Sequence, residues 1–186
     1  MNKDIFIYLK IAEIPIQIIF KKCEWSMAFR LFYSQFLKYY RGFTVSKRPY
    51  KSVATITVHE EPQLSFFSKK NDWYIYCFHK HYLHYQTHYQ ISIFQFQIII
   101  RDILIRLLAK RNGLFIHASA NLVGERVVLN VGSSGAGKST VARLQQKKHP
   151  IFADDTLVIR KIKKIWCAFQ LPFVEKKTFM HKSNIG

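Results

Sequence analysis

Acidic residues and cysteines are both scarce in this chain of 186 residues. It has 11 Asp and Glu against 29 Lys and Arg, which gives a formal net charge of +18. Its 3 cysteines, Cys23, Cys77 and Cys167, lie far apart without a C-x-x-C pair, so the sequence indicates neither a disulfide framework nor a zinc site. This cysteine usage fits a reducing compartment, and we expect a cytoplasmic protein.

Long uninterrupted hydrophobic runs are lacking as well. Residues 1–22 are apolar but are broken by charged residues and by Pro15, and they contain no small-residue cleavage site of a signal peptide. The apolar run at 91–100 is too short to span a bilayer and is followed directly by Arg101 and Asp102. We therefore expect no membrane segment.

The excess of positive charge invites a nucleic-acid or anionic-membrane interpretation. Lys outnumbers Arg 20 to 9, however, and Ile, Phe, Tyr and Lys are all abundant. A compositionally biased genome would impose this pattern on any soluble protein, and Lys without clustered Arg is weak evidence for the reading of bases. Nucleic acid is therefore not expected to be the main ligand.

Residues 1–108 predict a small α+β domain. Apolar and β-branched stretches predict five strands, at 5–10, 14–20, 53–58, 73–78 and 83–89. Apolar residues at helical spacing predict a helix over 25–40 that stops near Gly42. We expect its apolar side chains to pack in the core rather than to form a stacking surface; they are Met27, Leu31, Phe36, Leu37 and Tyr40.

The longest helix is predicted over residues 93–108, and we expect it to connect the two halves of the chain. Asp102 is placed to pair with Arg106, and Asn112 with Gly113 forms a typical C-terminal signal. Its apolar residues recur at spacings of three and four; they are Ile93, Phe96, Ile100, Ile103, Leu104, Leu107 and Leu108.

Four histidines in the N-terminal part raise the alternative of a metal site. They are His79, His81, His84 and His88. No carboxylate or cysteine lies between them to complete a ligand set. We therefore interpret them as solvent-facing strand and turn residues.

Glycine is scarce too, and three of the 7 glycines lie within six residues of one another. Residues 127–140, V-V-L-N-V-G-S-S-G-A-G-K-S-T, fill the pattern G-x-x-x-x-G-K-[ST] between a predicted strand and an amphipathic helix. This pattern predicts a phosphate-binding P-loop, whose backbone N–H groups and helix N-terminus face the anion. The predicted nucleotide-binding residues are Gly132, Ser133, Ser134, Gly135, Ala136, Gly137, Lys138, Ser139 and Thr140.

The loop chemistry implies ATP and Mg²⁺ as cofactors. Lys138 would neutralise the β- and γ-phosphates, and the Ser139 hydroxyl would complete the ligand shell of Mg²⁺. Beyond the loop helix, the strand I-F-A ends in Asp154 and Asp155. One carboxylate can hold Mg²⁺ while its neighbour accepts the proton of an attacking hydroxyl. The alternative is a solvated turn, since Asp is common in turns.

The same half of the chain supplies the remaining strands. Residues 113–122 predict one strand, 123–126 a turn and 127–131 a second strand that delivers the loop. Residues 156–161 and 164–169 predict a hairpin closed near Leu171 and Pro172.

These segments together resemble the catalytic domain of the HPr kinase/phosphorylase family, whose P-loop fold is related to phosphoenolpyruvate carboxykinase. The resemblance covers residues 109–175 through G-L-F-I-H-A-S-A, the P-loop, F-A-D-D and the hairpin. It implies that Lys138 and Ser139 bind phosphates and magnesium, that Asp155 is the proton acceptor with Asp154 beside it, and that His117 lies at the active site. Without the resemblance, His117 would be interpreted as a satisfied core residue.

The family continues beyond this hairpin with a glycine-containing segment, a distal Mg²⁺-binding glutamate and C-terminal helices. Here Glu175 is the last acidic residue, and it does not match that glutamate. We therefore expect an α/β protein with a truncated P-loop kinase domain at 109–186, built on an incomplete mixed sheet that a partner or further sequence would complete.

The expected function is that of an ATP- and Mg²⁺-dependent kinase, which transfers phosphate to a Ser hydroxyl of a protein or peptide. The principal alternative is a non-catalytic ATP-binding remnant or regulatory module. A small-molecule P-loop kinase and a nucleic-acid binder are further alternatives. The family resemblance also makes a homo-oligomer an expectation.

Overall fold

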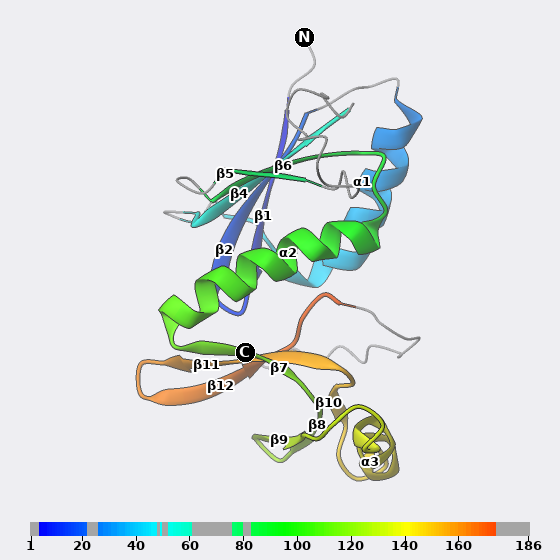
Figure 1. Ribbon diagram of the computed structural model, residues 1–186, viewed down its shortest axis with the longest axis vertical. Helices are drawn as coiled ribbons and strands as arrows, with labels where there is room; N and C mark the ends of the chain where they lie inside the picture. The colour runs from blue at the N-terminus through cyan, green and yellow to red at the C-terminus, as the bar shows by residue number, and fades with distance from the viewer. Residues whose placement is uncertain are drawn as a thin grey trace. The chain divides into compact units, whose positions relative to one another are not determined.

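The computed structural model describes residues 4–21, 26–47, 49, 52–60, 76–79 and 83–173. The chain divides into two units, Met1–Lys110 and Arg111–Gly186 (Figure 1). Both units contain strands and helix, so the protein is a mixed α/β protein with several sheets. The division lies close to the boundary expected between residues 108 and 109.

The first unit contains a six-stranded sheet with the order β3-β1-β2-β4-β6-β5. Strands β2, β4 and β6 pair in parallel, whereas the other neighbours are antiparallel, so this sheet is mixed. The strands are β1 (Ile5–Ile11), β2 (Ile14–Phe20), β3 (Thr44–Val45), β4 (Ala54–His59), β5 (Cys77–His79) and β6 (His84–His88). The predicted strand at 73–78 lies partly outside the described residues.

Two helices, α1 (Met27–Tyr40) and α2 (Ile93–Leu108), pack on this sheet, and each is followed by a short 3₁₀ helix, Arg41–Phe43 and Ala109–Arg111. Every second residue of β2 is fully buried, as expected for a strand with one face covered. Phe20 of β2 lies 5.0 Å from Phe36 of α1, and Phe36 lies 5.7 Å from Phe96 of α2, measured between ring centroids. The core of this unit is therefore an aromatic cluster between one sheet face and both helices.

The predicted buried face of α1 is wrong in part. Met27, Leu31 and Leu37 are 67%, 56% and 39% exposed, whereas Phe29, Phe32, Phe36 and Tyr40 are buried. Both sets have helical spacing, and the face that carries the larger aromatic area is the one that packs on the sheet. Ser26 caps the N-terminus of the helix, and its hydroxyl accepts a hydrogen bond from Phe29 N at 3.2 Å.

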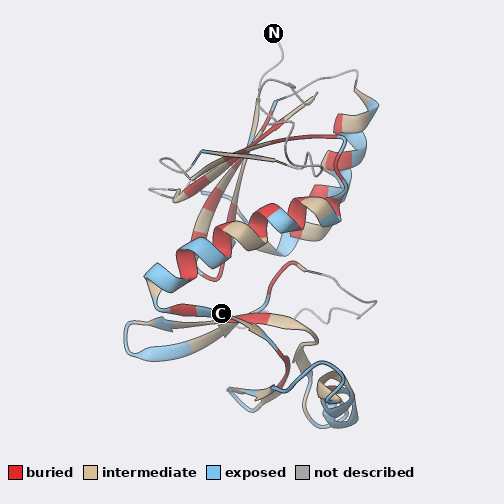
Figure 2. Cartoon of the chain, in the orientation of Figure 1, coloured by how far each residue is buried: buried red, intermediate tan, exposed pale blue. Residues whose placement is uncertain are grey.

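The prediction for α2 is confirmed. All seven apolar residues of the predicted stripe are buried, and buried and exposed positions alternate as the helix turns (Figure 2). Ser92 and Gln95 form a reciprocal capping box at its start. Arg106 Nε donates to Asp102 Oδ2 at 2.8 Å, as the spacing predicts. Among the described residues, no helix combines the length and apolarity needed to cross a bilayer.

The interpretation of the strand histidines needs correction. His88 is buried at 6% exposure and His84 is half-buried, because β6 lies inside the sheet between β4 and β5. His84 Nε2 lies 2.9 Å from Thr57 Oγ1, and burial, followed by repulsion from His79 and His59, lowers the pKa of His84. His79 is exposed, as expected. His81 lies outside the described residues.

The described strands of the second unit form two antiparallel three-stranded sheets, β10-β8-β9 and β12-β11-β7. This arrangement differs from the single mixed sheet expected here. The elements are β7 (Gly113–His117), β8 (Ser119–Val123), β9 (Arg126–Asn130), α3 (Lys138–Gln145), β10 (Ile151–Ala153), β11 (Thr156–Ile162) and β12 (Ile165–Phe169).

The strand predicted over 113–122 is divided at Ala118, where the chain passes from one sheet to the other. A matching break occurs at Asp154 and Asp155, between β10 and β11. Ala118 and Ala120 are fully buried against Leu157. The two sheets therefore share a small core at the point where both segments change partners.

Two tyrosines of the first unit provide a matched test of hydrogen bonding in its core. Both are fully buried, but Tyr85 donates to Asp102 Oδ2 at 2.7 Å, whereas the Tyr40 hydroxyl has no partner among the described residues. Burial raises the pKa of Tyr40 well above its usual range. Tyr40→Phe removes an unsatisfied polar group, so we expect it to raise the free energy of unfolding by about 1 kcal/mol.

Tyr85→Phe removes a hydrogen bond to a charged group, so we expect it to lower the free energy of unfolding by about 1.5 to 3 kcal/mol. Urea denaturation of both variants measures the difference. Equal destabilisation by the two changes would show that the Tyr40 hydroxyl is satisfied.

Candidate functional site

The topology of the second unit brings the predicted site residues to one end of a sheet, where strands begin and terminate. Strands β9 and β10 flank β8 and are both antiparallel to it. They therefore run in the same direction and terminate at the same end of the sheet, where β8 begins. This end carries the glycine loop after Asn130, the carboxylates Asp154 and Asp155, and His117 just before β8.

The glycine loop has backbone conformations that favour glycine. Gly135 and Gly137 have φ angles of 82° and 80°, in the left-handed region. At Gly132 an added Cβ would lie 3.1 Å from the Cβ of Ala136. Gly137 caps α3 without a side-chain hydrogen bond, so the first N–H groups of the helix are available to an anion.

The side chain of Lys138 folds back over the loop that precedes it. Its Nζ donates to the carbonyl oxygens of Gly132 at 3.1 Å and Ser133 at 2.9 Å. The loop thus curves around the ammonium group. This arrangement places a positive charge beside the loop backbone and the N-terminal end of α3.

Asp154 lies against the same helix. Ser139 Oγ donates to the Asp154 carbonyl oxygen at 3.2 Å, and Arg143 Nη2 lies 3.4 Å from Asp154 Oδ2. The other carboxylate oxygen, Oδ1, is buried and has no hydrogen-bond partner among the described residues. A buried unpaired carboxylate oxygen is costly, and it is a suitable ligand for a hard cation.

Asp155 has different partners from its neighbour. His117 Nδ1 lies 3.2 Å from Asp155 Oδ1, and Thr156 Oγ1 donates to Oδ2 at 2.7 Å. The contact follows from the register of β7 and β11, in which His117 is opposite Thr156. The side chains of His117 and Asp155 are 59% and 37% exposed, so His117 is not a core residue and the pair can meet a molecule from solvent.

Two polar residues that the sequence analysis did not single out, Ser119 and Asn121, attach α3 to the sheet, and a third, Asn130, bonds to both of them. Ser119 Oγ donates to the Lys138 carbonyl oxygen at 2.6 Å. Asn121 Nδ2 donates to the carbonyl oxygens of Ala142 at 2.9 Å and His149 at 3.0 Å. Asn130 Nδ2 lies 3.3 Å from Ser119 Oγ and from Asn121 Oδ1. In the sequence, Ala alternates with Ser and Asn along β8, and this alternation could have indicated a polar face on that strand.

Arg143 was also missed. It lies four residues after Ser139 on α3, so both side chains share a helix face, and both contact Asp154. The spacing was visible in the sequence, but the position of Asp154 beside that face was not.

No family model matches the chain, and no curated protein matches it in sequence. The resemblance to the HPr kinase family therefore remains a prediction.

The attachment of α3 by Asn121 can be tested directly. Asn121→Ala leaves the carbonyl oxygens of Ala142 and His149 without their donor, and we expect it to destabilise the second unit by about 2 to 3 kcal/mol. Hydrogen exchange of the α3 amides measures this loss. The control Gln145→Ala, at an exposed position of the same helix, should change exchange little; equal effects would contradict this role of Asn121.

Proposed function

We propose that the chain is an ATP- and Mg²⁺-dependent kinase of the HPr-kinase-like class, which phosphorylates a Ser hydroxyl of a protein or peptide in the cytoplasm. One observation carries the proposal. Two features lie at the same end of one sheet: the glycine loop, with Lys138 folded over it, and the carboxylates Asp154 and Asp155. A phosphate cradle and a proton acceptor are two of the parts that this Mg²⁺-dependent reaction requires.

The nucleotide phosphates would bind residues 132–140. The backbone N–H groups of the loop and of the first turn of α3 would contact the phosphate oxygens, and Lys138 Nζ would exchange its carbonyl partners for them. The exchange is favourable because an ammonium group binds a phosphate anion more strongly than neutral carbonyls.

Residues at the site fit a magnesium ion. Asp154 supplies a buried carboxylate oxygen without a partner among the described residues, and the Ser139 hydroxyl lies against the same residue. No group of three or more His, Cys, Asp or Glu suited to a metal occurs in the described part of the chain. Mg²⁺ needs only one or two carboxylates when phosphates complete its shell. When bound, it would neutralise charge on the phosphates.

Asp155 would act as the proton acceptor. As the acceptor hydroxyl oxygen bonds to the γ-phosphorus, the bond to the bridging oxygen breaks, ADP leaves and the hydroxyl proton passes to the Asp155 carboxylate. His117 and Thr156 hold this carboxylate from two sides, which limits its rotation. Its partial exposure leaves room for an acceptor side chain.

Nucleotide binding is tested at Lys138. Lys138→Ala removes a charge-assisted contact worth about 1.5 to 3 kcal/mol, so we expect Mg-ATP to bind about ten- to a hundredfold more weakly by calorimetry. Lys147→Ala, at an exposed position beyond the C-terminal end of α3, is the matched control and should leave the affinity unchanged. Unchanged affinity in Lys138→Ala would refute the phosphate-binding assignment.

The roles of the two carboxylates are tested by paired amide substitutions. Asp155→Asn keeps the side-chain shape but removes proton acceptance, so we expect ATP affinity within about threefold of the wild type and no phosphate transfer. Asp154→Asn should instead raise the Mg²⁺ concentration needed for binding. Labelled ATP with candidate peptides measures transfer.

The reverse pattern would exchange the two roles. ATP binding without transfer to any peptide by the unmodified chain would favour the alternative, a non-catalytic nucleotide-binding module.

A further inference from the structure

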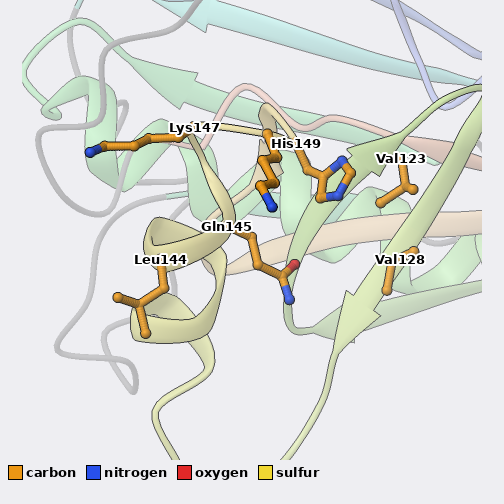
Figure 3. A pocket seen from close by; sticks show the side chains of 7 residues that line it. Val123, Val128, Leu144, Gln145, Lys147 and His149 are labelled. Carbon is orange, nitrogen blue, oxygen red and sulfur yellow. The ribbon is translucent and has the colours of Figure 1, made fainter.

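A groove of about 490 Å³ lies at the end of α3 opposite the glycine loop (Figure 3). Val123 and Val128 line it from strands β8 and β9. Leu144, Lys147 and Lys148 line it from the end of α3 and the turn that follows. The groove therefore uses none of the residues of the candidate kinase site.

The floor of the groove adjoins a sheet edge. Val128 is paired with Asn121, whose side chain bonds to α3, so Val128 lies on the α3 face of the sheet. Strand β9 is paired with β8 alone among the described strands. Val128 and Leu144 are 45% and 78% exposed. Leu144 points away from Val128 (Figure 3), on the side of α3 opposite its buried residue, Ala142. The open strand edge therefore lies beside one exposed apolar side chain, Val128.

The rim of the groove is basic. Lys147 and Lys148 are exposed, and so are Arg126 at the start of β9 and Glu125 in the turn before it. None of the described lining residues is acidic. A second copy of this chain, with its net charge of +18, would bring lysines against lysines. Charge complementarity instead favours an acidic partner.

The surroundings also favour a polypeptide over a nucleic acid. Single-stranded nucleic acids bind through aromatic side chains on which bases stack, and the described residues that line the groove include no Phe, Tyr or Trp. An open strand edge presents N–H and C=O groups at the spacing of another strand, and apolar pockets beside it accept alternate side chains.

We propose that the β9 edge and this groove bind an acidic, extended segment of another protein as an added strand. Every second side chain of the segment would point to the α3 face. Apolar side chains at these positions would lie on Val128, and carboxylates at these positions would face Lys147 and Lys148. The site is independent of ATP binding and of phosphate transfer.

A labelled short peptide of repeating Val-Ser-Glu-Ser, whose Val and Glu share one strand face, is titrated with the full chain without nucleotide to test this proposal. We expect Lys147→Glu with Lys148→Glu to weaken binding about tenfold or more, and Val128→Thr, which keeps the side-chain shape, to weaken it severalfold. Lys163→Glu with Lys164→Glu, which makes the same change in net charge on the exposed β11–β12 turn, should stay within about twofold. Lys138→Ala should not change peptide binding. A failure of the kinase proposal can therefore be told apart from a failure of this one.

Other results would overturn the proposal. Equal losses in the two double variants would indicate general charge attraction. Equally tight binding of the same peptide with Pro in place of each Ser, which lacks N–H donors at alternate positions, would exclude strand addition. Tighter binding of single-stranded oligothymidine, lost in Lys147→Glu with Lys148→Glu, would identify a nucleic-acid surface. A chain dimer that Val128→Thr dissociates would make a second copy the occupant.

Discussion

The candidate site depends on the pairing of two distant segments, 113–123 and 151–162. In one sheet Ala120 is opposite Ala153, and in the other His117 is opposite Thr156. Because both segments leave one sheet and enter the other at the same point, Asp154 and Asp155 lie at the corner between the sheets instead of continuing a strand. The corner lies beside the helix that follows the glycine loop. Without this shared break, the two carboxylates would be ordinary strand residues with alternating directions.

Local signals in the sequence predicted those elements that depend on local spacing. The stripe of α2 from Ile93 to Leu108 was found because its apolar period fits one helical face, and the glycine loop because its pattern is contiguous. The buried face of α1 was mistaken, since Leu31 and Phe32 both fit helical spacing and the sheet decides between them. The break at Ala118 was not predictable, because it depends on pairing with residues about forty positions away.

The same distinction applies to the candidate site. Lys138, Ser139, Asp154 and Asp155 have chemical identities that a pattern can recognise, and the structure places Ser139 in contact with Asp154. Ser119, Asn121 and Asn130 belong to no motif, and their role arises from facing the underside of α3. Residues that support a site are harder to predict than those that contact a ligand, because only the tertiary arrangement gives them partners.

Helix α3 has a single buried residue, Ala142, so little hydrophobic area attaches it to the unit. Hydrogen bonds from Ser119 and Asn121 attach it instead. Apolar contacts are non-directional and permit small rotations, whereas a hydrogen bond to a chosen carbonyl oxygen fixes the angle of the helix about its axis. The outer surface of α3 is thereby released from any packing requirement, and its exposed positions can change in sequence without altering the direction in which the helix N-terminus points.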